Sequence, residues 1–142
     1  MTRIYYITFT EDSKVDTLPE SFEKSMTYIF NEEDLKKTIF MEYGKSEVMI
    51  INIDEYKFDK FLKLLKEYHY LNAYKDITTD MVMNNPISED FDNFLKILPK
   101  RDKEKVNQMI IDVVDIDMIL DKISAKGIDS LTELDKIILE NH

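Results

Sequence analysis

The sequence of 142 residues contains no cysteine, no tryptophan, only two glycines and only two histidines. The lack of cysteine excludes disulfides, thiolate metal sites and a cysteine nucleophile. The two glycines, Gly44 and Gly127, are far apart, whereas phosphate-cradling loops need two or three glycines within a few residues. Arginine is also scarce, with two residues against seventeen lysines, so few guanidinium groups are available to bind phosphates in a bidentate manner. These shortages argue against thiol chemistry and nucleotide-binding loops.

The charged residues that are present are mostly acidic, with 29 Asp and Glu against 19 Lys and Arg and a net charge of −10. Binding to nucleic acid needs clustered Lys and Arg, so we expect no nucleic-acid partner. The acidity fits a protein kept soluble by its charge, and it also fits an acidic face presented to a basic partner protein. A mimic of nucleic acid would need carboxylates in two rows, and the interspersed lysines argue against it.

No segment has the pattern of a signal peptide or a membrane span. The apolar stretch at the N-terminus has about six residues before Glu11 and Asp12, too few for a secretory signal. Later uncharged runs are far below the ~18 residues of a membrane helix. We therefore expect a cytoplasmic protein with no membrane partner. Hydrophobic residues make up 44% of the chain, including eight Phe and eight Tyr, which is enough for a folded core.

The first half of the sequence alternates between strand and helix patterns. Residues 3–9 and 47–53 predict strands, and residues 70–77 predict a weaker one. Asn31 is a favourable N-cap for a helix over 32–43 that would end at Gly44, and Asp54 caps the next helix. Residues 20–30 fit a helix and a strand equally well. The pattern predicts a two-layer β-α-β-α part over residues 1–80.

The second half of the sequence is predicted to be entirely helical over residues 88–142. Residues 78–87 resemble a connection, Ser88 caps one helix, and further helices follow over 103–112 and from Asp115 or Asp117 to Lys126, unless those two are continuous. A capping box from Ser130 to Glu133 predicts the start of the last helix. The fold class is therefore α+β, with the helical part packed on the core as a single unit.

Apolar residues in this half repeat at heptad-like spacing and predict a buried seam. The residues are Met109, Val113, Ile116, Leu120 and Ile123. This seam is too short for a coiled coil and could pack within one chain or against a second copy. Monomer and homodimer both remain open.

Seven residues are candidates for contact with a partner. Four are the densest acidic group, Asp112, Asp115, Asp117 and Asp121, and three are aromatic, Tyr68, Tyr70 and Tyr74. On a helix the aspartates would form two neighbouring pairs, but no calcium-binding loop pattern is present, and capping of helices in solvent is the simpler role. The tyrosines would serve as a binding platform or as sheet-edge packing.

His69 is the only histidine that could serve as a catalytic base, because His142 is terminal. It lies at the end of a lysine-rich helix, where a basic side chain is structurally ordinary. We therefore expect no catalytic residue, no cofactor and no metal site.

Residues 116–134 contain the motif Ile-Leu-Asp-Lys-Ile, then Gly127, then Ser130-Leu131-Thr132. This stretch resembles a short helical-hairpin tail at the cytoplasmic C-terminus of many bacterial rhomboid-family membrane proteins. The resemblance implies a bacterial cytoplasmic protein with a small docking or capping module, in which Leu120, Ile123, Leu131 and Leu134 close a cluster. The tail has no catalytic residues, so the resemblance implies no protease activity.

Together these observations predict a non-enzymatic protein that acts by protein–protein contact, as an inhibitor, an immunity-type protein or an adaptor. A small-ligand-binding protein or minor enzyme using carboxylates and tyrosines of the α+β part is one alternative. An acidic nucleic-acid mimic is another.

Overall fold

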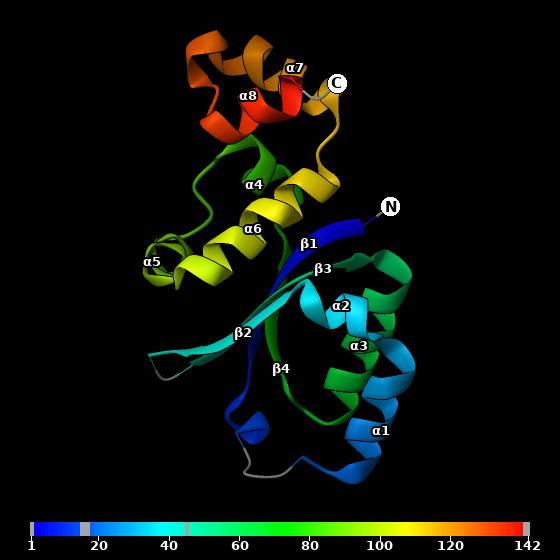
Figure 1. Cartoon of the computed structure of the whole chain (residues 1–142). Coiled ribbons are helices and arrows are strands. Elements are labelled where there is room, and N and C mark those ends of the chain that lie inside the picture. Colours follow the sequence, from blue (N-terminus) through cyan, green and yellow to red (C-terminus); the bar gives the residue numbers. More distant parts are fainter. Residues whose placement is uncertain (1, 15–17, 45, 141–142) are drawn as a thin grey trace. The chain divides into compact units, whose positions relative to one another are not determined.

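The computed structural model of the protein describes residues 2–14, 18–44 and 46–140. This described part contains one four-stranded antiparallel sheet and eight α-helices, which confirms the predicted α+β class (Figure 1). The chain divides into a first unit, Met1–Asp76, which carries the sheet, and a second unit, Ile77–His142, which is helical. None of the helices in the described ranges is long and apolar enough to cross a membrane.

The first unit is a sheet with helices on one face. Its elements are β1 (Thr2–Phe9), the 3-10 turn η1 (Glu11–Ser13), α1 (Glu20–Ile29), α2 (Glu32–Lys36), β2 (Thr38–Tyr43), β3 (Ser46–Asp54), α3 (Glu55–Glu67) and β4 (Leu71–Asp76). The strands lie in the order β2-β3-β1-β4, so β2 and β4 are the two edges. Every neighbouring pair is antiparallel.

The core of this unit forms where alternate residues of the central strands meet the helices. Tyr5 and Ile7 of β1 and Ile51 of β3 belong to one buried cluster with Phe22 of α1 and Phe61 of α3. This follows from the two-residue repeat of a strand, which sends every second side chain to the same face. The most hydrophobic predicted strand, residues 47–53, is therefore the centre of β3.

The predicted helix over residues 32–43 is wrong in its second half, because α2 ends at Lys36 and residues 38–43 form β2. The start is as expected: Asn31 and Asp34 form a capping box. Beyond it, Thr38 to Tyr43 pair in continuous register with Ile51 to Ser46 of β3. These β-branched and aromatic residues suit a strand once a partner strand is present, so the pairing overrides the helical pattern. Residues 20–29, for which the sequence left two options, form helix α1.

The second unit consists of short helices. They are α4 (Thr78–Met83), α5 (Glu89–Ile97), α6 (Lys100–Val113), α7 (Ile116–Lys126), the 3-10 turn η2 (Ile128–Ser130) and α8 (Glu133–Glu140). The expected connection over 78–87 is therefore partly wrong, since it contains α4, which ends at the left-handed Asn84. Ser88 caps α5 as expected, accepting a hydrogen bond from the Phe91 amide at 3.1 Å.

In the α6–α8 region one sequence prediction is confirmed, that of two separate helices, and one is wrong, that of the apolar seam. Helices α6 and α7 are separate because Asp115 caps α7. The predicted apolar seam does not continue into α7, which buries Ile119, whereas Leu120 is 51% exposed. The cluster expected to include Leu120 therefore does not form around it. The break between the helices rotates α7, so a spacing counted across it does not describe one face.

Candidate functional site

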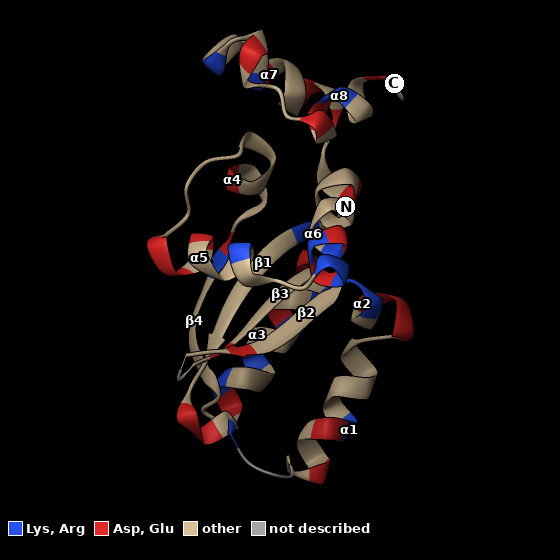
Figure 2. Ribbon diagram, turned by 60° about the vertical axis from the view of Figure 1, so that its left-hand side comes forward, with Lys and Arg blue, Asp and Glu red and all other residues tan. Residues whose placement is uncertain are grey.

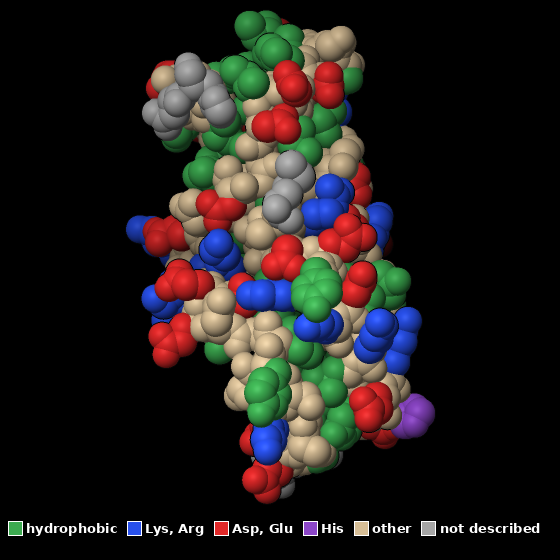
Figure 3. Space-filling model, turned by 90° about the vertical axis from the view of Figure 1, so that its right-hand side faces the viewer, with side chains coloured by type: hydrophobic (Ala, Val, Ile, Leu, Met, Phe, Trp, Pro, Cys, Tyr) green, Lys and Arg blue, Asp and Glu red, His purple; other side chains and the backbone are tan. Residues whose placement is uncertain are grey.

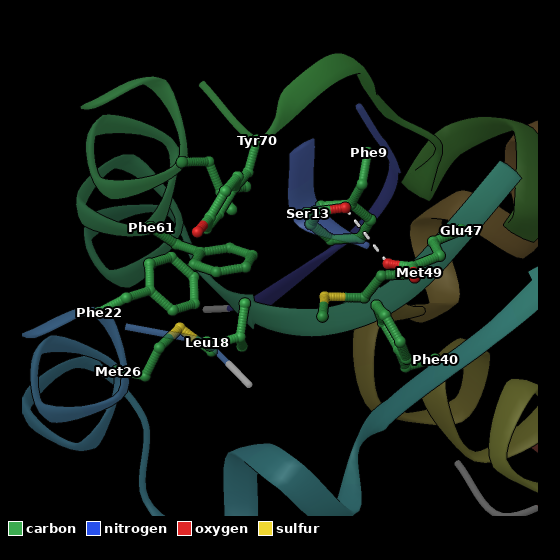
Figure 4. A pocket seen from close by; sticks show the side chains of 11 residues that line it. Phe9, Ser13, Leu18, Phe22, Met26, Phe40, Glu47, Met49, Phe61 and Tyr70 are labelled. Atoms are coloured by element: carbon green, nitrogen blue, oxygen red, sulfur yellow. Dashed lines mark hydrogen bonds between the residues drawn. The ribbon is translucent and has the colours of Figure 1, made fainter. Parts of the chain in front are cut away.

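An apolar hollow lies in the first unit on the helix-covered face of the sheet, between α1 and the β2–β3 hairpin (Figure 4). Its first part has a volume of about 220 Å³ and is lined by Phe9, Ser13, Leu18, Phe22, Met26, Phe40, Glu47, Met49, Phe61, Leu65 and Tyr70. A second part of about 630 Å³ continues along α1 to α2 and is lined by Leu18, Phe22, Glu23, Met26, Thr27, Phe30, Asn31, Glu32 and Leu35. We call the two parts together the apolar hollow.

The hollow exists because the helices cover the sheet unevenly. Met49 of β3 is buried at 9% exposure, whereas its register partner Phe40 on the edge strand β2 is 53% exposed. The Phe40 ring contacts Phe9 edge to face, with centroids 5.6 Å apart. Leu18, Phe22 and Met26 lie on the opposite wall in Figure 4. Large apolar side chains therefore face a space that no side chain of the described residues fills.

The rim of the hollow is acidic. Glu23 and Glu32 line the part beside α1 and α2, and Glu47 lines the part beside β3. Figure 2 shows acidic positions on α1 and at the start of α2. The lining residues of the described chain include no Lys or Arg. An apolar interior with carboxylates around it suits a ligand that is itself apolar and positively charged at its margins.

The polar pair in the hollow has a structural role. The Ser13 hydroxyl donates to the Thr10 carbonyl at 2.7 Å, and it lies 3.3 Å from a Glu47 carboxylate oxygen. The shorter contact assigns the single hydroxyl proton to the main chain. The Thr10 contact closes the η1 turn, and the longer contact places Ser13 beside Glu47 of β3.

Of the three candidate tyrosines, only Tyr70 lines the hollow. Tyr68 lies behind it: its ring packs on Phe22 at 5.1 Å and its hydroxyl is 2.5 Å from that of Ser21. Tyr74 lies on β4, 51% exposed, and packs on Phe58. The Tyr68 and Tyr70 rings pack on each other, with centroids 5.6 Å apart, whereas Tyr74 lies on the edge strand β4. Two of the three candidate rings are therefore in contact.

The four candidate aspartates all lie in the second unit and are all exposed. Asp115 caps α7 by accepting from the Met118 amide at 2.9 Å, and Asp112 on α6 accepts from the Gln108 amide side chain at 2.9 Å. The expected pairing of Asp112 with Asp115 on one helix is wrong, because the chain breaks between α6 and α7. Asp117 and Asp121 do share α7, one turn apart.

His69 is exposed and directly follows Tyr68, the C-cap of α3, in a left-handed conformation with φ of 60°. Its backbone carbonyl accepts a hydrogen bond from the Thr10 hydroxyl at 2.7 Å. His69 is not among the residues that line the apolar hollow. Within the described ranges, no group of three or more His, Asp or Glu residues is placed to hold a metal ion.

Sequence reasoning missed a buried ion pair in the second unit. The ammonium of Lys122 on α7 lies 2.5 Å from the Asp135 carboxylate on α8, and both side chains are almost fully buried. The same carboxylate oxygen accepts from the Thr132 amide at 2.9 Å, while the Thr132 hydroxyl accepts from the Asp135 amide at 3.1 Å. Thr132, not Ser130, is thus the cap of α8. The spacing from Thr132 to Asp135 is a capping-box spacing and could have revealed this.

Comparison with known protein families gives a match at the end of the chain. Residues 110–142 match a family model described as "Family of unknown function (DUF6576)". No curated protein and no solved structure matches the chain. The matched segment includes α7 and α8, and with them the Lys122–Asp135 pair. The resemblance of residues 116–134 to the rhomboid tail stays a prediction.

Proposed function

We propose that this protein is a non-enzymatic binding protein, with an inhibitor, immunity-type or adaptor role, that holds apolar side chains of a basic partner protein in the apolar hollow. The observation that carries this proposal is the combination of an apolar interior and an acidic rim at one place on the first unit.

The interior of the hollow supplies the binding energy. Removing apolar surface from water stabilises a complex by roughly 25 cal/mol per Å². Leu35 and Phe40, at 56% and 53% exposure, lie at the margin and become covered when a partner binds. The larger part, at 630 Å³, is within the range of about 300–1,000 Å³ that is typical of ligand sites.

The rim selects the kind of ligand. Carboxylates of Glu23, Glu32 and Glu47 repel the anionic head of a fatty acid and attract Lys or Arg from a protein. The net charge of −10 speeds the approach of a cationic protein, and Asp112, Asp115, Asp117 and Asp121 add to that long-range field. Figure 3 shows acidic and basic side chains interspersed on one face, which favours a local acidic contact over a phosphate-like array.

The polar groups near the hollow favour binding over catalysis. A nucleophilic serine needs a base within hydrogen-bond reach to take its proton. The Ser13 proton is held by the Thr10 carbonyl, and His69 is not among the lining residues. The carboxylate of Glu47 then serves better as an attractive charge than as a base.

Selection from a displayed library of random twelve-residue peptides tests the proposal. We expect the enriched peptides to combine large apolar residues with Lys or Arg, and to lose binding to Leu35→Glu and Met26→Glu. Tyr28→Glu is the matched control, because Tyr28 lies on α1 at 81% exposure and does not line the hollow. Circular dichroism establishes that each variant is folded. Failure to enrich any peptide, or equal binding by the hollow variants and the control, would overturn the proposal.

A small apolar ligand is the competing occupant, and the neutral dye Nile red tests it. If the natural chain binds the dye, the Leu35→Glu variant does not, and no peptide is selected, the hollow is assigned to a small ligand instead of a protein.

A further inference from the structure

The two edges of the sheet differ in how they are protected. Edge strands expose hydrogen-bonding groups, and natural proteins block them with charges, prolines or bulges. β4 carries Lys75 and Asp76, its pairing with β1 has a register shift, and Asp76 forms an ion pair with Arg3. β2 pairs with β3 without a shift, has no Pro or Lys, and carries Glu42 as its one charge. β2 is therefore the unprotected edge.

The hydrogen bonding of the β2–β3 ladder shows which backbone groups face outward. The Asn52 amide donates to the Lys37 carbonyl at 3.2 Å, which makes this pair hydrogen bonded. Because such pairs alternate along an antiparallel ladder, Ile39 and Met41 bond to β3, and the amides and carbonyls of Phe40 and Glu42 point away from it. In the described part of the chain, no turn, loop or cap hydrogen bond uses these outward groups.

The side chains of the same two residues lie on the hollow side of the sheet. Phe40 lines the hollow beside Met49, its register partner. Glu42 lies directly opposite Glu47, which also lines the hollow. Like charges directly opposite each other in a sheet repel and destabilise the pairing. A positive side chain placed beside Glu42 and Glu47 would remove this repulsion.

We infer that β2 binds an extended segment of the partner protein as a fifth strand, whose side chains on the hollow side include an apolar residue beside Phe40 and a Lys or Arg beside Glu42. This inference rests on the proposed function and adds the binding mode. The added strand bonds to the amides and carbonyls of Phe40 and Glu42 and covers the exposed Phe40 ring. A second copy of this chain does not fit, because its own Glu42 and its charge of −10 would add to the repulsion.

A nine-residue peptide, Thr-Ile-Thr-Lys-Thr-Ile-Thr-Lys-Thr, is the probe, and fluorescence anisotropy gives its Kd. N-methylation of alternate amides blocks one edge of the peptide at a time. We expect methylation of the amides that face β2 to weaken binding by about tenfold or more, since several hydrogen bonds are lost. Methylation of the amides that face away from β2 should leave the Kd within about twofold.

Charge exchange tests the register. Glu42→Lys should weaken binding of the probe by about tenfold, and a peptide with Glu in place of both Lys should bind this variant again. Lys75→Glu on the β4 edge is the matched control and should leave the Kd unchanged. Equal sensitivity to both methylation patterns, or no effect of Glu42→Lys, would overturn the added strand. Self-association of the protein through β2, measured by sedimentation, would assign the edge to a second copy instead.

The two proposals fail in different ways. If binding needs Leu35 and Met26 but is unchanged by methylation of the peptide backbone, the hollow is the binding site and the peptide is not an added strand. Binding that is indifferent to Leu35→Glu and Met26→Glu removes the proposed function itself.

Discussion

The first unit and the α7–α8 hairpin of the second unit are stabilised by different chemistry. The first unit has a broad apolar core of aromatic and aliphatic side chains, and none of its described carboxylates is buried. The hairpin buries one charged pair, Lys122 and Asp135, as well as Ile119 and Ile138. Apolar contacts are non-directional and share their energy among many atoms, whereas a buried charge depends on one partner. The first unit should therefore tolerate most single changes of charge, and the hairpin should not tolerate this one.

Replacing Asp135 with Ala should have the largest effect. It leaves the Lys122 ammonium buried without its carboxylate, which costs about 3–5 kcal/mol of unfolding free energy. All eight tyrosines lie in the first unit, so tyrosine fluorescence reports on that unit alone. In urea, we expect the part of the helical circular dichroism that comes from the second unit to be lost at a lower concentration than in the natural chain, while the midpoint of the tyrosine fluorescence change stays the same. Asp121→Ala, an exposed change on α7, is the control.

A double replacement sharpens this result. Lys122→Met combined with Asp135→Leu removes both charges and places apolar side chains there, so it should recover most of the stability that Asp135→Ala loses. The part that stays lost is the cap of α8, because the Thr132 amide no longer has the Asp135 carboxylate as its acceptor. A double variant as unstable as Asp135→Ala alone would contradict the view that the unpaired charge causes the loss.

The first unit should respond to alkaline pH through Tyr5. Burial, followed by the nearby carboxylates of Asp76 and Glu55, raises the pKa of Tyr5 to about 12 from an ordinary value of 10. The unfolded chain therefore loses this proton first. The stabilisation that protonated Tyr5 gives to the folded state is fully present below pH 10. It is lost as the pH rises to 12, which lowers the free energy of unfolding by up to about 3 kcal/mol.

Tyr5→Phe checks the alkaline prediction, because it keeps the ring stacked on Phe58 and removes the titrating group. Urea unfolding at pH 9 and at pH 11.5 should show a smaller loss of stability in this variant than in the natural chain. Equal losses would show that other groups control the alkaline behaviour.

The smallest effect concerns the start of α2. Asn31 and Asp34 satisfy each other's amides at 2.9 and 3.0 Å, and Asp34 also accepts from the Lys57 ammonium at 2.6 Å. Asn31→Ala should cost about 1 kcal/mol, read as a lower urea midpoint of tyrosine fluorescence. Asn31→Ser keeps a capping oxygen and should lower the free energy of unfolding by only about a few tenths of a kcal/mol. Equal midpoints for the two variants would mean that the cap contributes nothing.

Local patterns in the sequence predicted much of the fold. Strand β3 and the caps at Asp54 and Ser88 follow from alternation and from side-chain oxygens at helix starts. The errors came where a distant partner decided the outcome. Thr38 to Tyr43 has a pattern compatible with a helix, and only pairing with β3 makes it a strand.

The candidate site was less predictable than the fold. Tyr70 was selected from the sequence and does line the hollow. Phe9, Met26 and Phe40 look like ordinary core residues in the sequence, because nothing local indicates that the space among them stays open. Lys122 resembles any surface lysine until α8 places Asp135 beside it.

By itself, the sequence determined the acidic charge, the absence of thiol and glycine-loop chemistry, and the elements whose signals lie within a few neighbouring residues. Folding makes β2 an edge strand, leaves an apolar hollow between α1 and β2, and buries Lys122. The physical reason is distance along the chain: alternation and capping act over two to four residues, whereas a sheet edge, a hollow and a buried ion pair depend on segments that only folding brings together.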